Sequence, residues 1–156
     1  MTWLIVGLLV FLVPHSIGLA APQWRARYVA RLGEKPWKGL YSLVSLVGFV
    51  LIAAAYVPRT KIKAALGHPM TAGVALWAFA HLLANGQLHD VVLFGAFLVW
   101  SVATFVIRRS RDRESGTTYP PGTVAKDAIA IVAGIVVSVG FALFLHGPLI
   151  GVRPFG

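Results

Sequence analysis

Five apolar stretches, each long enough to cross a lipid bilayer, dominate this sequence and limit the folds that it can adopt. The hydrocarbon core of a bilayer is about 30 Å thick, and a helix needs roughly 17 to 25 apolar residues to cross it. With 58% hydrophobic residues and a mean hydropathy of +0.78, the chain is more apolar than a typical soluble domain. We therefore predict an all-α integral membrane protein, a single domain over residues 1–156 that forms a bundle of about five transmembrane helices. The predicted spans are 3–21, 39–57, 70–86, 91–107 and 128–146.

The first stretch, 3–21, is expected to remain in the protein rather than to be removed as a signal peptide. No basic residue precedes it, its apolar run is too long, and Pro14 and His15 interrupt it. A proline and an ionisable histidine are unusual inside a membrane span, which makes His15 a candidate functional residue.

The 14 basic residues outnumber the 5 acidic ones, and all but Arg153 lie in the connections 24–38, 59–63 and 108–126. Basic residues that flank spans are attracted to anionic head groups, whereas a nucleic-acid-binding protein needs a basic face on a folded module. We therefore expect the lipid bilayer, and no nucleic acid, as the partner of these charges.

Five spans would place the two ends of the chain on opposite sides of the membrane. We call the side that holds Met1 side A; it also carries the connections 58–69 and 108–126. Side B carries 22–38, 87–90 and the C-terminal tail. The Lys and Arg counts of the two sides are nearly equal, so the positive-inside rule decides little, but the basic cluster in 22–38 favours side B as the cytoplasmic side.

Two connections have distinct patterns. Segment 22–38 places Trp24, Tyr28 and Leu32 at helical spacing beside arginines, which is typical of a short helix in the membrane interface; a solvated loop fits equally well. Segment 108–126 is rich in turn residues and has no apolar face, so we expect a flexible, exposed loop.

Small residues recur in two spans and favour close helix packing. They are Ser42, Ser45 and Gly48 in the second span, and Ala130, Gly134, Ser138 and Ala142 in the fifth. In lipid, such rows allow helix backbones to approach each other; the alternative is that a flat apolar ligand lies against the smooth face. For Trp77 and Trp100, near span centres, interhelical packing and pocket lining are the two interpretations.

Two histidines lie inside spans, where ionisable residues are costly and mark candidate functional sites. His15 and His81 each lie about three residues past the midpoint of their span. Because the first and third spans run in the same direction, both imidazoles are expected at a similar depth, displaced toward side B.

Two neutral imidazoles at matched depth could supply the two axial nitrogens of a buried haem. Each axial histidine needs a partner for its outer ring nitrogen, and Ser16, Asn85 and the Val10 carbonyl, which Pro14 leaves without its helical donor, are candidates. The alternative is that each histidine only forms a hydrogen bond to another helix.

The other polar residues add little chemistry. His146, at the side B end of the fifth span, is either a helix-end residue or a ligand; His89 is a weaker candidate, and His68 most simply starts the third span. The chain has no cysteine, so it has no disulfide, thiolate ligand or cysteine nucleophile. It also has no HExxH motif, and its acidic residues lie at span ends or in loops, which argues against a zinc site and against a carboxylate-pair hydrolase.

Six segments in order along the chain resemble the NnrU family, which is related to the zeta-carotene isomerases of plants and cyanobacteria. They are "PHS" (14–16), "RLGEKPWKGLYSLVSLVG" (31–48), "GHPM" (67–70), "LWAFAHLLANG" (76–86), "LFGAFLVWSV" (93–102) and "FLHGPLIGVRP" (144–154).

The resemblance implies an integral protein of the bacterial inner (cytoplasmic) membrane and, on the isomerase branch, a haem b that serves to isomerise a carotenoid double bond. On this resemblance His15 and His81 would be the iron ligands and the catalytic residues. Trp77, Asn85 and His146 are candidate cofactor contacts from their positions in the sequence alone. A ligand scheme that includes a cysteine does not fit, because Ala78 stands in the corresponding position.

The sequence is compatible with three functions. The first is haem-dependent cis-trans isomerisation of an apolar, carotenoid-like polyene that enters from the bilayer. The second is a haem redox or nitric-oxide-related accessory protein of denitrification. The third is a non-haem assembly subunit with structural histidines. The expected partners are a lipophilic small molecule and either a second copy of the chain or a respiratory-chain protein.

Overall fold

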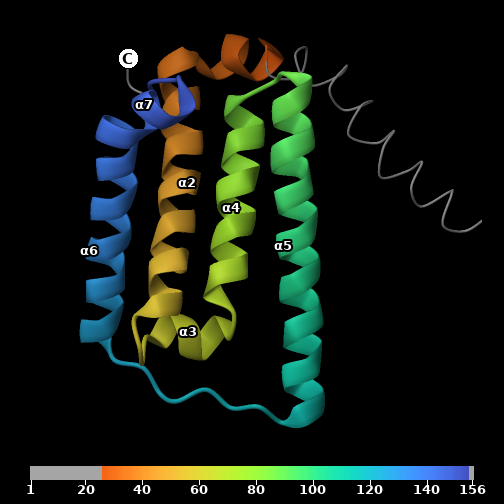
Figure 1. Ribbon diagram of the computed structural model, residues 1–156, viewed down its shortest axis with the longest axis vertical. Helices are drawn as coiled ribbons and strands as arrows, with labels where there is room; N and C mark the ends of the chain where they lie inside the picture. Colours follow the sequence, from red (N-terminus) through yellow and green to blue (C-terminus); the bar gives the residue numbers. More distant parts are fainter. Residues whose placement is uncertain (1–25, 155–156) are drawn as a thin grey trace, which may run out of the picture.

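Four long helices stand side by side in one row in the computed structural model, which describes residues 26–154 (Figure 1). Their order across the row is α6, α2, α4 and α5, and α2 packs against both α4 and α6 while α5 packs against α4. The bounds are α2 (Glu34–Tyr56), α4 (Pro69–Ala84), α5 (Leu88–Ser115) and α6 (Val124–Gly140).

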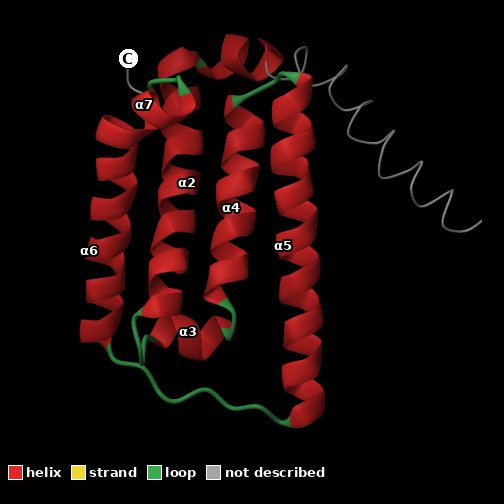
Figure 2. Cartoon of the chain, in the orientation of Figure 1, coloured by secondary structure: helices red, strands yellow, loops and turns green. Residues whose placement is uncertain are grey.

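The prediction of an all-α membrane protein is confirmed. Helices account for the regular structure of residues 26–154, which contain no strand (Figure 2). Three helices, 34–56, 88–115 and 124–150, are long and apolar enough to cross a membrane, and α4 is a shorter apolar helix. The predicted span 3–21 lies outside the described residues, and the single-domain assignment stays a prediction.

The helix that starts with α6 changes its winding before it ends. A π-helical turn, η1 (Phe141–Leu145), follows α6, and α7 (His146–Ile150) continues from it. Pro148 has no N–H, and its ring requires space where an α-helix places the carbonyl of the residue four positions earlier, here Phe144. A wider turn just before Pro148 provides that space.

The connections gather at the two ends of the row as predicted (Figure 1). The side B end holds residues 26–32, the α4–α5 turn and α7, and the side A end holds α3 (Lys61–Leu66) and the segment before α6. Residues 26–32 form a helix across the side B end, which agrees with an interfacial helix rather than a loop. Its end is marked by Gly33, whose φ of 86° lies in the left-handed region that glycine tolerates.

Small residues bring the helices of the row into backbone contact. A Cβ atom on Gly48 of α2 would lie 2.8 Å from the carbonyl oxygen of Gly73 of α4, and one on Gly134 of α6 would lie 2.6 Å from the Cα atom of Val50. Ala130, one turn before Gly134, is fully buried. The packing interpretation of the fifth-span row is therefore confirmed at these two positions, while Ser138 and Ala142 are half-buried.

The expectation of a flexible loop over 108–126 is wrong for its first part, because α5 continues through Arg108 to Ser115. Polar residues in this extension are compatible with a helix in water, and Ser110 donates a hydrogen bond to Glu114 at 3.0 Å. Gly116, with φ 65°, ends the helix. The rest of the segment is tied to the start of α3, where the Thr123 N–H donates to the Arg59 carbonyl at 3.0 Å.

Enlarging Gly134 tests the packing of α6 on α2. We expect Gly134→Leu to lower both the yield of monodisperse protein and its melting temperature, because overpacking a helix contact typically costs about 1–3 kcal/mol. Gly140→Leu is the matched control in the same helix, since a Cβ atom placed there would have no neighbour within 4 Å. Equal behaviour of the two variants in size-exclusion chromatography and thermal unfolding would contradict direct helix contact at Gly134.

The arrangement of the connections predicts the membrane topology. A reporter inserted after Gly116 and one fused after Gly156 should report opposite sides, and side B should be the cytoplasmic one. A pair of reporters such as alkaline phosphatase and green fluorescent protein measures this directly. Both reporters on the same side would rule out the five-span arrangement.

Candidate functional site

His81 lies in the last turn of α4, at the side B half of the row, where it is half-buried and contacts two aromatic rings. Its imidazole centroid is 4.7 Å from that of Trp77, one turn earlier, and 4.6 Å from that of Phe94 on α5. The Trp77 ring also meets Phe94 and Phe97 edge-to-face, at 5.3 and 5.7 Å. Such pairs stabilise a fixed ring geometry, so α5 holds the imidazole from one side and α4 from the other.

The hydrogen bond of His81 fixes its tautomer. Nδ1 lies 2.8 Å from the carbonyl oxygen of Trp77, and because a carbonyl only accepts, Nδ1 carries the proton of the neutral ring. Nε2 then keeps its lone pair, and within residues 26–154 it has no hydrogen-bond partner. A histidine whose outer N–H is bound to a carbonyl is the arrangement found in metal-ligating histidines.

Asn85 is not the acceptor for the outer nitrogen of His81, as had been expected, whereas its contact with a cofactor stays a prediction. Its backbone N–H donates to the His81 carbonyl at 2.9 Å, which caps the helix, and the acceptor for the imidazole is the Trp77 carbonyl instead. The reason is geometric, since a carbonyl four residues earlier lies directly beneath a histidine in a helix.

Trp77 and Trp100, for which interhelical packing and pocket lining were the two interpretations, differ in the structure. Trp77 packs between helices, as predicted, and also borders His81. Trp100 is 55% exposed, so the packing prediction is wrong for it in the described part of the chain. Trp100 belongs to α5, which lies at the edge of the row and, among the described helices, packs against α4. Much of the surface of such a helix is available for contact with lipid.

His146 lies at the same end of the molecule as His81 and within electrostatic range of it, as does Asp90. Its Nδ1 lies 2.6 Å from the Val152 carbonyl, so its Nε2 is also the unprotonated nitrogen of the neutral ring. His89 is different: its side chain is 75% exposed and pairs with Asp90 at 3.5 Å.

Among the described residues, His81 offers a nitrogen ligand between aromatic rings of two helices. Residues 26–154 contain no group of three or more His, Cys, Asp or Glu that could hold a metal ion, so a site made only of protein ligands is not formed there. His15 lies outside the described residues, and its matched depth with His81 stays a prediction. The Nε2 nitrogen of His81, beside Trp77 and Phe94, could serve as a protein ligand to a metal-containing cofactor that supplies its remaining ligands itself.

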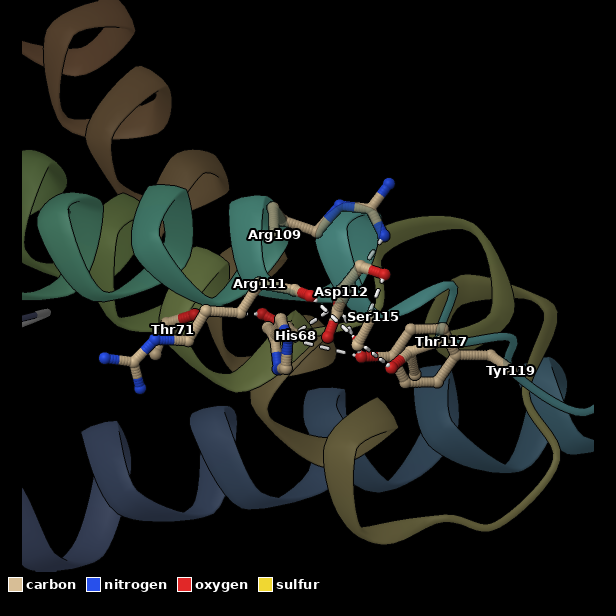
Figure 3. Close-up of polar contacts among 8 residues, drawn as sticks. All are labelled: His68, Thr71, Arg109, Arg111, Asp112, Ser115, Thr117 and Tyr119. Atoms are coloured by element: carbon tan, nitrogen blue, oxygen red, sulfur yellow. Dashed lines mark hydrogen bonds and ion pairs between the residues drawn. The ribbon is translucent and has the colours of Figure 1, made fainter.

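A second polar cluster, at the side A end, was missed by sequence reasoning (Figure 3). His68 Nε2 donates to Asp112 Oδ2 at 3.0 Å, and the Tyr119 hydroxyl donates to the same oxygen at 2.8 Å. Arg109 Nη1 lies 3.9 Å from it. We call these four residues the side A cluster. It joins the N-cap of α4, the end of α5 and the segment before α6.

The side A cluster lies beyond the apolar part of α5. Its residues shift the pKa values of Asp112 and Tyr119. The hydrogen bond from Tyr119, with the charges of His68 and Arg109, holds the pKa of Asp112 below its ordinary value. Burial and the neighbouring carboxylate raise the pKa of Tyr119. Asp112 is thus ionised and Tyr119 protonated near neutral pH, the states in which their hydrogen bond is strongest.

One comparison with known proteins gives a match. A family model described as NnrU protein matches residues 3–60 and 46–154, which together cover almost the whole chain. Searches of curated proteins and of solved structures found no significant match.

Removing the Tyr119 hydroxyl tests the side A cluster. The pKa of Asp112 is lowered in the folded protein, so its stabilising effect is present above its unfolded pKa of about 3.9 and is lost as the pH falls through the folded pKa. We expect Tyr119→Phe to lower the melting temperature at pH 7, by an amount that shrinks as the pH falls below about 4. Tyr56→Phe, at a tyrosine that is 74% exposed, is the control; a Tyr119→Phe effect independent of pH would contradict this account.

Proposed function

We propose that the chain, which belongs to the NnrU family, is a b-type haem-binding integral membrane protein that isomerises a double bond of an apolar, carotenoid-like polyene. The membrane character rests on the apolar helices. The cofactor and the reaction are the proposal.

One observation carries the proposal: the tautomer of His81. With Nδ1 on the Trp77 carbonyl, the imidazole presents Nε2 as a lone-pair donor without any cost of reorientation. A histidine that served only to join helices would use its outer nitrogen for a hydrogen bond to another helix. Here the bond lies within α4, and the nitrogen that could reach outward has no partner among residues 26–154.

The residues around His81 suit an iron ligand in a dry site. Trp77 and Phe94 restrict the rotation of the imidazole on both sides, and Phe94, 8% exposed, keeps water from one face. His15 is the proposed second ligand. When bound, the haem would supply an iron that exchanges electron density with a conjugated chain; the protein would supply position and an apolar surrounding.

The surface near His81 suits a lipophilic substrate that arrives from the bilayer. α5 exposes large apolar side chains along its length, among them Leu93, Phe97 and Trp100. Charged groups are confined to the two ends of the helix, so the path along its middle is apolar. A long hydrocarbon could reach this part of the row without crossing water.

Haem content of histidine variants tests the proposal. Protein expressed with haem supplied should give a b-type band in a reduced-minus-oxidised spectrum. His81→Ala should lose most of this band, and the double change His15→Ala and His81→Ala should abolish it. His89→Ala, at an exposed position on the same side, and His68→Ala, in the side A cluster, should retain it.

Different results of these experiments would reject different parts of the proposal. Absence of the band in the unchanged protein would reject haem binding and favour an assembly subunit. A band that persists in the double variant would reject these two ligands. Ready binding of carbon monoxide to the reduced protein would agree with a ligand that leaves the iron, whereas a protein that resists carbon monoxide would fit the redox or nitric-oxide-related alternative.

A further inference from the structure

A cavity opens at the side A end, far along α2 from His81. Its volume is about 210 Å³. It is formed by the turn after α2, by α3 and by the segment that leads to α6, and its lining residues are Pro58, Arg59, Thr60, Lys63, Ala64, Tyr119 and Pro120.

We infer the depth of the cavity in the membrane from the end of α2, an apolar helix long enough to cross a bilayer, and place it where the apolar core gives way to head groups. α2 ends at Tyr56, whose 74% exposed ring is typical of the interface belt, and the lining begins two residues later. Lipid phosphates occupy this level of a bilayer, so the cavity opens where they are concentrated.

Two cations line the cavity, and the nearby acidic residues do not neutralise them. Lys63 Nζ donates to the Ala55 carbonyl at 3.2 Å, which leaves further ammonium protons to donate. The Arg59 side chain has no hydrogen-bond or ion-pair partner within residues 26–154. Asp112 is occupied by the side A cluster, and Asp127 accepts from the Ile62 N–H at 3.2 Å.

Arg59 has an unusual backbone conformation. Arg59 has φ 59°, in the left-handed region that long side chains rarely adopt, and the Thr123 N–H holds its carbonyl. Non-glycine residues in this conformation cluster at ligand sites. Gly122 is required next to it, since a Cβ there would collide with the backbone of Thr60 and Lys61.

Apart from Thr60, the remaining wall is largely apolar. Pro58, Ala64 and Pro120 contribute hydrocarbon, and the Tyr119 ring is held by its bond to Asp112 (Figure 3). Tyr119 also packs over Gly67, where a Cβ atom would lie 2.9 Å from the ring. A free phosphate ion gains nothing from such walls, whereas a phospholipid has glycerol and acyl carbons beside its phosphate.

We propose that this cavity binds the head group of an anionic phospholipid of the side A leaflet, with Arg59 and Lys63 on the phosphate and the prolines and Tyr119 against the glycerol. The site is independent of haem and of the reaction proposed above. Its occupation would tie the α2–α3 turn and the segment before α6 to one lipid molecule.

Lipid binding by purified variants tests this site. Native mass spectrometry of the full chain in detergent, titrated with phosphatidylglycerol or phosphatidylcholine, measures binding of a single lipid. We expect tighter binding of phosphatidylglycerol, weakened about fivefold by Arg59→Gln and similarly by Lys63→Gln, as one cation near a head group contributes. Arg59→Lys should restore most of the binding. Arg113→Gln, which removes an exposed side A cation outside the cavity, should leave it unchanged.

Three results would overturn the proposal. Equal weakening by Arg113→Gln and Arg59→Gln would mean that diffuse surface charge attracts the lipid. Displacement of the lipid by millimolar inorganic phosphate would mean a free-anion site. Unchanged binding in both Arg59→Gln and Lys63→Gln would remove the cavity from lipid recognition. If Arg59→Gln does not fold, as judged by its melting curve, Lys63→Gln alone decides.

Discussion

Contact between helix backbones inside lipid is the constraint on which this structure depends. Apolar side chains gain nothing by leaving a bilayer for a protein interior, so helices must be held by close packing and by polar bonds. Gly48 and Gly73 let α2 and α4 touch at their backbones, and Gly134 does the same for α6 at Val50. Because α2 stands between the two, it sets the position of α4 and thereby of His81.

The aromatic rings next to His81 serve both the fold and the site. Trp77, Phe94 and Phe97 are the ring contacts through which α5 lies against α4, and the same rings confine the imidazole. A change that loosens α5 would therefore also free the ring of His81. Packing and the orientation of the His81 imidazole cannot be altered separately at Trp77.

The sequence predicted those parts of the molecule that bilayer thickness and local spacing determine. The long helices overlap the expected spans, although α2 begins at Glu34 rather than at 39 and α5 ends at Ser115 rather than at 107. His81 is predictable as a candidate because a histidine inside an apolar helix is costly. Contacts between distant residues were not predictable in this way. His68 and Asp112 are 44 residues apart, and they meet only because α5 runs on to Ser115, where a loop had been expected. The acceptor for His81 is the Trp77 carbonyl rather than Asn85, because a side chain in a helix can bond to the carbonyl one turn earlier even where no proline has freed that carbonyl.

Because of the π turn η1, the direction in which the last residues of the α6–η1–α7 helix point depends on the number of residues in the turn rather than on their hydropathy. Successive residues of an α-helix are rotated by about 100°, and a π turn accommodates one residue more than an α turn. Loss of one residue from Phe141–Leu145 could be absorbed by reverting to α-helical winding, with every residue before the turn kept on its face. An insertion or deletion that no such change of winding compensates would instead alter the angular phase between Gly134 and His146. The helix would stay apolar, but its last imidazole would face a different neighbour.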